Sequence, residues 1–294
     1  MRRSLLLLTA LTLAGVSLLM LLRALLGPLS PPSIVAYMTL ETGLPVVIVH
    51  DLKHNLKKRL DFDFFTEPSF APDGARLALT AYLNFGSDIV VYDLRSASLL
   101  KLSDSVAIAE SPAWSPDGRW IAFASNREGD NNIYIIRPDG RDQRRLTLHQ
   151  AGDRQPAWAP DSGSIAFTSN RGGGWDLYRI DLFSGEVTRL TDHGAPDTSP
   201  DWSPDGRRIV FASGREGASA IYLLELATGA VSPLVVASRY DSLPKWTPDG
   251  RAVSFARSID GVSRVMLVDV TSKQVRRLEL DEVSADALAW WRGL

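Results

Sequence analysis

The chain of 294 residues is 45% hydrophobic, which is ample for a core, and it carries 32 basic and 34 acidic residues for a net charge of −2. That balance leaves no basic surplus for a polyanion, so no nucleic-acid partner is predicted. The chain has no cysteine, which excludes a disulfide framework, a cysteine-ligated metal, a cysteine nucleophile and a lipid-modified cysteine.

The N-terminus has the pattern of an export signal. Arg2 and Arg3 precede the uncharged run Leu5–Leu22, whose eighteen residues reach the lower bound for a helix across roughly 30 Å of hydrocarbon. The arginines favour a cytoplasmic N-terminus. We therefore predict a transmembrane signal anchor at residues 1–26, a proline-rich linker at residues 27–32 and an extracytoplasmic remainder, periplasmic or at the cell surface.

A cleaved signal peptide is the open alternative, and it would give a secreted protein. It has the same charged start, but its apolar core is usually about 7–15 residues and ends in a small-x-small site. No clean Ala-x-Ala site follows the run.

From residue 33 onward, one unit recurs every 44 residues. An aromatic residue precedes a turn of the Pro-Asp-Gly type, in which proline presets φ and glycine relaxes the exit, so each turn joins two strands. A period in the forties that contains strands and turns predicts a radial array of four-stranded blades. The aromatic positions are Phe70, Trp114, Trp158, Trp202, Trp246 and Trp290.

The repeat at residues 112–147 shows the order of strands within a blade. The predicted strands are residues 112–115, 120–125, 133–136 and 143–147, which we term A to D. Proline recurs in strand A, at Pro68, Pro112, Pro156, Pro200 and Pro244. A central strand cannot lose an amide donor but an edge strand can, so strand A is predicted to line a central channel.

The two ends of the repeat region complete each other. Residues 34–60 match strands B to D of a blade, and Ala289, Trp290 and Trp291 match the missing strand A. The sequence therefore predicts an all-β, six-bladed β-propeller of four-stranded antiparallel blades over residues 33–294. Its N- and C-terminal strands share one blade, which leaves no free edge.

The recurring aromatic residues and turn aspartates are interpreted as structural. A large ring once per blade fills the wedge between neighbouring sheets, which explains it better than a ligand-stacking ring does. Aspartate in such a turn bonds its own backbone.

Carboxylates also recur in the connections from strand D to the next strand A, which share one face with the B–C loops. One interpretation is that they pair with arginines of the B–C loops and tie the loops together. The other is an acidic channel mouth that receives a basic peptide or a cation. The partner-binding candidates are Glu67, Glu110, Asp153, Asp197, Asp241 and Asp286, with Arg127, Arg171 and Arg215 further out.

No catalytic motif is present: the sequence lacks Gly-x-Ser-x-Gly and His-Glu-x-x-His, and its four histidines share no repeat position. No cofactor and no resident metal are predicted, and we expect a protein that is not an enzyme. The alternative is a calcium-dependent hydrolase, lactonase-like or phosphoesterase-like. Its carboxylates at the channel mouth would be Glu110, Asp153, Asp197 and Asp241.

The run Ser-Pro-Asp-Gly-Arg-x-Ile-x-Phe-x-Ser-Asn-Arg, with Ile-Tyr shortly after it, resembles the repeat of TolB-type propellers over most of residues 33–294. The resemblance implies the fold, a place in the cell envelope and a loop face that docks a protein. Family members with an α/β domain before the propeller differ from this chain, which has no room for one between Pro32 and Ile34. Similar repeats precede the hydrolase domain of prolyl-oligopeptidase-like enzymes, and no such domain follows here. We therefore expect a non-enzymatic propeller that binds a protein or peptide.

Overall fold

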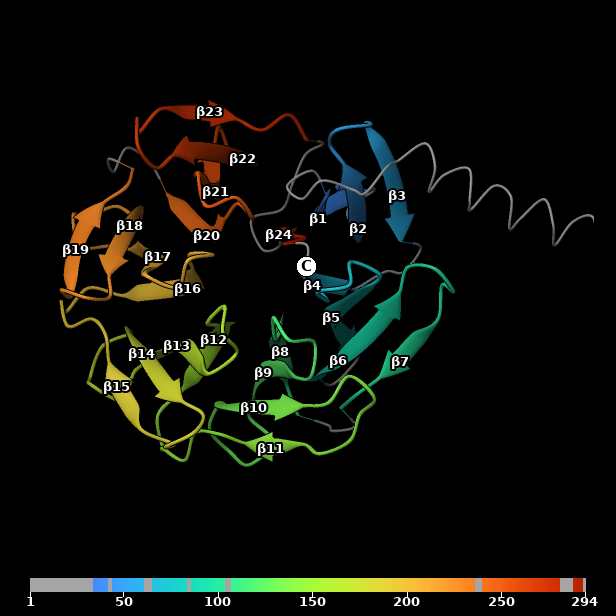
Figure 1. The fold of residues 1–294 in the computed structure, drawn as a ribbon, viewed down its shortest axis with the longest axis horizontal. Helices are drawn as coiled ribbons and strands as arrows, with labels where there is room; N and C mark the ends of the chain where they lie inside the picture. Colours follow the sequence, from blue (N-terminus) through green and yellow to red (C-terminus); the bar gives the residue numbers. More distant parts are fainter. Residues whose placement is uncertain are drawn as a thin grey trace, which may run out of the picture.

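The structure is a computed structural model that describes residues 34–41, 44–60, 65–83, 86–103, 107–235, 240–280 and 288–292. Six four-stranded antiparallel sheets are arranged as blades around a central axis (Figure 1). The predicted all-β, six-bladed propeller is confirmed.

The strands follow one another blade by blade along the chain. Blade 1 contains β24 (Leu288–Trp290), β1 (Ile34–Glu41), β2 (Leu44–Asp51) and β3 (Leu56–Leu60); blade 2 contains β4 (Phe65–Phe70), β5 (Arg76–Leu83), β6 (Gly86–Asp93) and β7 (Leu99–Lys101); blade 3 contains β8 (Ala109–Trp114), β9 (Ile121–Ser125), β10 (Asn132–Ile136) and β11 (Arg144–Arg145). Blade 4 contains β12 (Asp153–Trp158), β13 (Ser164–Ser169), β14 (Asp176–Asp181) and β15 (Val187–Arg189); blade 5 contains β16 (Asp197–Trp202), β17 (Arg208–Ser213), β18 (Ala220–Glu225) and β19 (Ala230–Pro233); blade 6 contains β20 (Asp241–Trp246), β21 (Ala252–Ile259), β22 (Val262–Asp269) and β23 (Val275–Arg277).

Blade 1 closes the ring as predicted. Strand β24 pairs antiparallel with β1, with Trp290 opposite Val35. The indole N–H of Trp290 also donates to Ser254 Oγ in blade 6 at 2.8 Å. The C-terminal strand therefore holds the first and last blades together and leaves neither with a free inner edge.

The innermost strand of each blade is a sheet edge, which confirms the place predicted for strand A. In β4, β8, β12, β16 and β20 the pairing register shifts around the recurring proline, so each of these strands contains a β-bulge. The residue before that proline has a positive φ of 52–56°. The bulge leaves proline unpaired, where its missing N–H costs no ladder bond.

The core is divided into six apolar clusters, each lying between two neighbouring blades. Trp158, for example, packs between Ile133 of blade 3 and Tyr178 of blade 4. The six recurring aromatic residues are at most 8% exposed. Their predicted role as wedge fillers is confirmed.

The turn between the first two strands of a blade also behaves as predicted. In blade 3, Asp117 Oδ1 accepts the N–H of Arg119 at 3.0 Å, and Gly118 has a φ of 73° that L side chains rarely adopt. The same aspartate contact recurs at Asp73, Asp161, Asp205 and Asp249. The turn aspartates are therefore structural.

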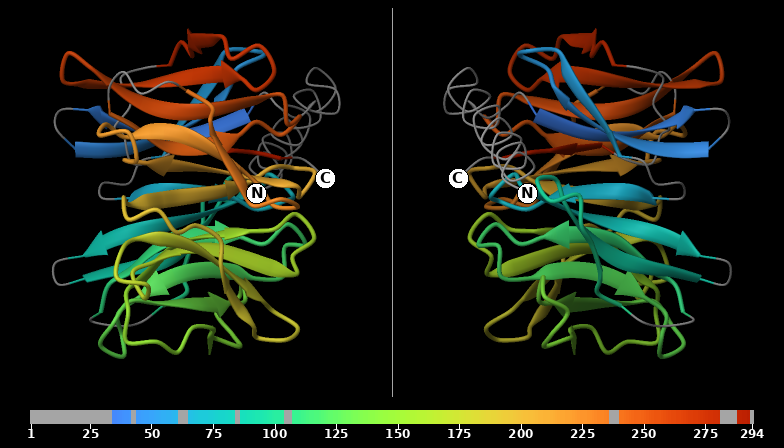
Figure 2. Two further views of the ribbon diagram at one scale, coloured as in Figure 1. Left: turned by 90° about the vertical axis from the view of Figure 1, so that its left-hand side faces the viewer. Right: turned by 90° about the vertical axis from the view of Figure 1, so that its right-hand side faces the viewer.

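The connections lie on two faces, between which the strands run (Figure 2). The B–C and D–A loops touch: Asn126 N–H donates to Ile108 O, and Gly152 N–H donates to Asn170 Oδ1. We call their side the loop face and the opposite side, which carries the A–B and C–D turns, the hairpin face.

The predicted anchor at residues 1–26 and linker at residues 27–32 lie outside the described residues. Within the described part of the chain, no helix is long and apolar enough to cross a membrane.

Candidate functional site

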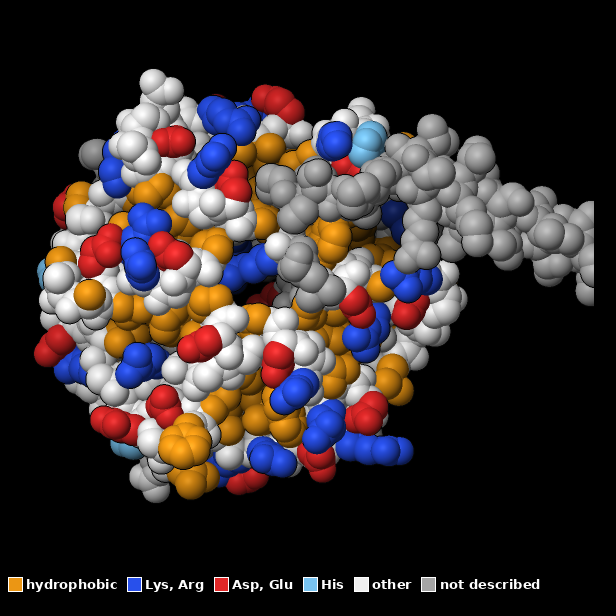
Figure 3. All heavy atoms as spheres, in the orientation of Figure 1, with side chains coloured by type: hydrophobic (Ala, Val, Ile, Leu, Met, Phe, Trp, Pro, Cys, Tyr) orange, Lys and Arg blue, Asp and Glu red, His pale blue; other side chains and the backbone are white. Residues whose placement is uncertain are grey.

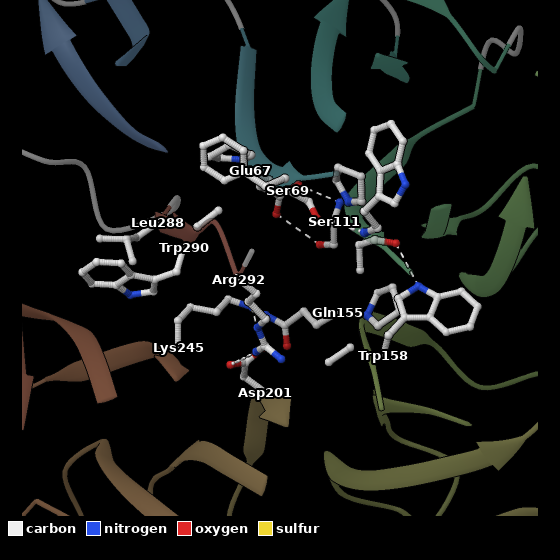
Figure 4. Close-up of a pocket in the computed structure, with 18 of the residues that line it drawn as sticks. Glu67, Ser69, Ser111, Gln155, Trp158, Asp201, Lys245, Leu288, Trp290 and Arg292 are labelled. Carbon is white, nitrogen blue, oxygen red and sulfur yellow. Dashed lines mark hydrogen bonds and ion pairs between the residues drawn. The ribbon is translucent and has the colours of Figure 1, made fainter. Parts of the chain in front are cut away.

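The inner strands enclose a cavity of about 230 Å³ on the propeller axis (Figure 4). At each bulge, the residue before the proline points toward this cavity. The sequence alone did not predict this. The sequence does contain a signal for these lining residues, because the residue before the recurring proline of strand A varies from blade to blade. These lining residues are Glu67, Ser111, Gln155, Ser199 and Leu243.

Polar side chains at the bulges join neighbouring blades in pairs. Glu67 Oε2 accepts the N–H of Ser111 at 2.7 Å, and Oε1 accepts the Ser111 hydroxyl at 3.1 Å. Two blades on, Gln155 Oε1 accepts the N–H of Ser199 at 2.9 Å, and Nε2 donates to Ser199 Oγ at 3.0 Å. Glu67 thus lines the cavity, while both its carboxylate oxygens hold blade 2 against blade 3.

Three of the predicted mouth carboxylates are fully buried, so the exposed acidic ring is wrong for them. Each accepts two hydrogen bonds from an arginine of its own blade, which offsets the cost of burying the charge. The pairs are Asp153 with Arg171 at 2.8 and 2.9 Å, Asp197 with Arg215 at 3.0 Å twice, and Asp241 with Arg257 at 2.7 Å twice.

Arg171 and Arg215 connect the B–C loop to the blade beneath it, whereas Arg257 lies within β21. The guanidinium carbon of Arg171 lies 5.2 Å from the ring centre of Phe167 and 5.0 Å from that of Tyr178. Arg171 Nε also donates to Ser169 Oγ at 2.9 Å. Arg–Asp pairing, one of the two interpretations of the sequence, therefore operates within a blade.

Blade 3 has the arginine without its aspartate. Ala109 stands at the position of Asp153, and Arg127 stacks on Phe123 and Tyr134 as its counterparts do. Arg127 Nη2 is buried and has no hydrogen-bond partner among the described residues. Burial lowers the pKa of Arg127, and the nearby Tyr134, Asp88 and Glu128 oppose this shift only in part.

Glu110 is a half-buried carboxylate at the loop-face mouth. Burial raises its pKa, the negative charge of Glu67 raises it further, and Arg154 opposes the shift. Arg154 itself is exposed and stacks 5.2 Å from the ring centre of Trp175. This part of the mouth combines an acid, a base and an aromatic ring, whereas Asp286 lies outside the described residues.

The carboxylates proposed for calcium do not converge. Asp153, Asp197 and Asp241 stand in three different blades, and both oxygens of each are bonded to an arginine. No three His, Asp or Glu side chains within the described ranges are grouped to hold a metal ion. The donor set of the alternative hydrolase therefore does not fit calcium.

The loop face also exposes large apolar side chains that the sequence reasoning missed. Leu148 is 81% exposed, Tyr240 76%, Tyr82 46% and Ile108 41%. Leu148, Tyr240 and Ile108 lie in D–A connections, and Tyr82 lies at the end of β5 in a B–C hairpin. Only the fold shows that these four residues share one face.

A charged cluster inside the cavity was also missed. Arg292 Nη2 lies 2.9 Å from Asp201 Oδ2, and Lys245 Nζ lies 3.9 Å from Asp201 Oδ1. All three residues line the cavity. The sequence did contain a signal, because these three residues are charged where the other blades have serine, alanine or proline.

Comparisons with known proteins agree with this geometry. The model of the TolB β-propeller domain family matches residues 24–153 and 154–290. Two solved structures are similar to this chain. One is TolB from Acinetobacter baumannii, with a TM-score of 0.76, 22% identity and coverage of 88% of this chain and 66% of that one. The other is putative TolB from Agrobacterium tumefaciens, with a TM-score of 0.72, 25% identity and coverage of 85% of this chain and 91% of that one.

The tricorn protease also shares the fold, with a TM-score of 0.66, 15% identity and coverage of 86% of this chain but 27% of the protease. No match is found among curated proteins. The chain spans about two thirds of the length of the Acinetobacter TolB.

Proposed function

The chain belongs to the TolB β-propeller domain family, and from this premise we propose that it is a non-enzymatic protein that docks a protein or peptide partner on its loop face. The observation that carries the proposal is the set of exposed apolar side chains there. Large apolar and aromatic residues on a rigid surface are the residues around which protein interfaces form.

The polar surroundings suit a protein partner as well. Glu110 and Arg154 lie beside Glu67 at the mouth, where they would set the orientation of a bound chain. Asp153 and Asp197 would act indirectly, because Arg171 and Arg215 fix two B–C loops in place before the partner arrives. Asp241 instead pairs with Arg257 of strand β21. Preorganised loops lose less entropy on binding.

We further propose that the propeller is extracytoplasmic and tethered by residues 1–26, as the Arg2-Arg3 start and the apolar run Leu5–Leu22 suggest. The chain enters the propeller at Ile34, whose carbonyl accepts the N–H of Trp291 beside the hairpin face. A tether attached there would leave the loop face turned away from the membrane. The full-length protein should resist extraction at alkaline pH, whereas release into the soluble fraction would contradict the tether.

The docking proposal is tested by paired surface variants. Leu148→Ser combined with Tyr240→Ser removes two apolar contacts from the loop face, and Phe183→Ser is the matched control on the hairpin face, where Phe183 is fully exposed. After chemical cross-linking in the native envelope, the loop-face variant should lose the cross-linked partner at least tenfold, while the control retains it. Equal retention by both variants would contradict docking on the loop face.

A further inference from the structure

The charged cluster in the cavity occupies three channel positions at which a charged residue replaces the small residue or the proline of the other blades. Five blades have proline two residues after the aromatic position, and the sixth has Arg292. The residue before the aromatic position is serine or alanine in four blades, but aspartate and lysine in blades 5 and 6. Those residues are Ser69, Ala113, Ala157, Asp201, Lys245 and Ala289.

The three departures come together in space. Arg292 follows β24 in blade 1 and reaches past blade 6 to Asp201 on β16 of blade 5, where Nη2 also donates to the carbonyl of Trp202 at 3.2 Å. Figure 4 shows Arg292 over the cavity, with Lys245 and Asp201 beside it and Glu67 on the opposite wall. Because the other blades build the same wall from small residues and proline, the scaffold does not require these charges. Sites that break a local rule are often functional.

The cluster has uncommitted cationic donors. Asp201 is 11% exposed, and its Oδ2 already accepts the N–H of Trp246 at 2.8 Å. Lys245 is 37% exposed, and its ammonium group forms no hydrogen bond within the described part of the chain. Arg292 donates hydrogen bonds to the described residues through Nη2 alone. Two cations thus share one carboxylate, and their remaining donors face the cavity, where Figure 3 shows basic side chains within the central hollow.

The lining also limits the kind of anion. Lys245 and Arg292 carry two positive charges, and Asp201 offsets one of them. Glu67 on the opposite wall offsets the other, so a dianionic phosphate is less favoured than a single carboxylate. Arginine binds carboxylate with paired donors, and lysine adds a point charge. Prolines of the inner strands, with Leu243 and Trp290, give the rest of the cavity an apolar surface for an organic group.

We propose that Lys245 and Arg292 form a carboxylate-binding site in the central channel, which takes a small organic acid or the C-terminus of a peptide. This site is separate from the docking surface on the loop face. Binding at the channel site therefore does not depend on a partner at the loop face.

Calorimetric titration of the purified full-length chain tests the site with N-acetylglycylglycine as the free acid and as its carboxamide. The acid should bind at least tenfold more tightly than the amide, and added salt should weaken it. If the acid also binds at least tenfold more tightly than acetate, the ligand is a peptide terminus, whereas equal affinities indicate a free small acid. Inorganic phosphate should bind more weakly than the acid.

Variants assign the binding to the cluster. Lys245→Met should weaken binding of the acid at least tenfold, and Lys245→Arg should stay within about threefold of the wild type. Lys273→Met, at an exposed lysine of a C–D turn, is the matched control and should bind as the wild type does. The proposal is overturned if acid and amide bind equally, if phosphate binds as tightly as the acid, if no heat appears up to 10 mM, or if folded Lys245→Met binds unchanged. The acid–amide comparison uses the wild type alone, so it decides even where a variant fails to fold.

Discussion

Arg215 Nη2 lies 3.0 Å from both carboxylate oxygens of Asp197, and the two side chains are 12% and 0% exposed. The carboxylate belongs to inner strand β16 and the guanidinium to the B–C loop of the same blade. The pair therefore fixes a loop of the proposed docking face against a strand of the channel wall. Blade 4 repeats it with Asp153 and Arg171.

Removing one partner of such a pair should be costly. Asp197→Asn leaves Arg215 buried without a counter-charge, and we expect a loss of about 3 kcal/mol in the free energy of unfolding. Combining Asp197→Asn with Arg215→Met should cost less than the sum of the single changes, because no unpaired charge remains. Urea denaturation followed by tryptophan fluorescence measures both. A single variant within about 0.5 kcal/mol of the wild type would contradict the assigned role.

Blade 3 allows the reverse experiment. Ala109→Asp supplies the carboxylate that Arg127 Nη2 lacks, and we expect a gain of about 1 kcal/mol, since the buried guanidinium acquires a charged acceptor. Ala109→Asn is the isosteric control and should not stabilise the fold. The result that would count against this reasoning is an aspartate variant no more stable than the asparagine variant at neutral pH.

The repeat made the fold predictable, whereas the site depended on details within the repeat. The aromatic position and the Pro-Asp-Gly turn set the blade, and Ala289 with Trp290 identified the shared blade. The equal spacing of Asp153, Asp197 and Asp241 suggested a ring, but spacing does not reveal burial. In the fold these side chains point into the blade, toward the arginines eighteen or sixteen residues later.

Glu110 should make stability depend on pH. Its pKa is raised in the folded state by burial first and by Glu67 second, so the ionised form opposes folding at neutral pH. Glu110→Gln should therefore be more stable than the wild type above the folded pKa. The advantage should shrink as the pH falls through that value and vanish below the unfolded value of about 4.5, where both states are protonated.

Urea denaturation of both proteins between pH 4 and pH 8 measures this difference, and partial exposure of Glu110 keeps it modest. An advantage for Glu110→Gln that is constant over the whole range would exclude ionisation of this carboxyl as its cause.

Closure of the ring can be tested at two equivalent glycines. Gly74 and Gly118 have φ of 65° and 73°, so alanine at either costs about 1 kcal/mol in backbone strain. A Cβ at Gly74 would lie 2.6 Å from the ring of Trp291, whereas at Gly118 the nearest atom, in Pro72, is 3.6 Å away. Gly74→Ala must also displace Trp291, whose indole N–H donates to Pro72 O at 3.0 Å.

We therefore expect Gly74→Ala to cost about 1–2 kcal/mol more than Gly118→Ala in thermal or urea unfolding. Equal losses would mean that Trp291 does not stabilise the junction between blades 1 and 2.

The channel cluster shows why a repeat search has limits. A period reveals what the blades share, whereas Asp201, Lys245 and Arg292 are charged residues at positions where the other blades have serine, alanine or proline. The sequence places them 44 and 47 residues apart, and only the closed ring brings Arg292 across the channel to Asp201. The exposed apolar residues of the loop face were missed for a related reason. Ile108 and Tyr240 occupy one repeat position, but Gly152 and Pro196 stand there before blades 4 and 5, so no recurring apolar residue marks it.

Site-specific photo-cross-linking tests docking on the loop face most directly, and the absence of cysteine permits a single label. Leu148→Cys places the label on the loop face, and Phe183→Cys places it on the hairpin face, both at highly exposed positions. In the native envelope, the label at residue 148 should capture one defined protein or peptide partner and the label at residue 183 should not. Capture of that partner from residue 183, or from neither position, would contradict the proposed function.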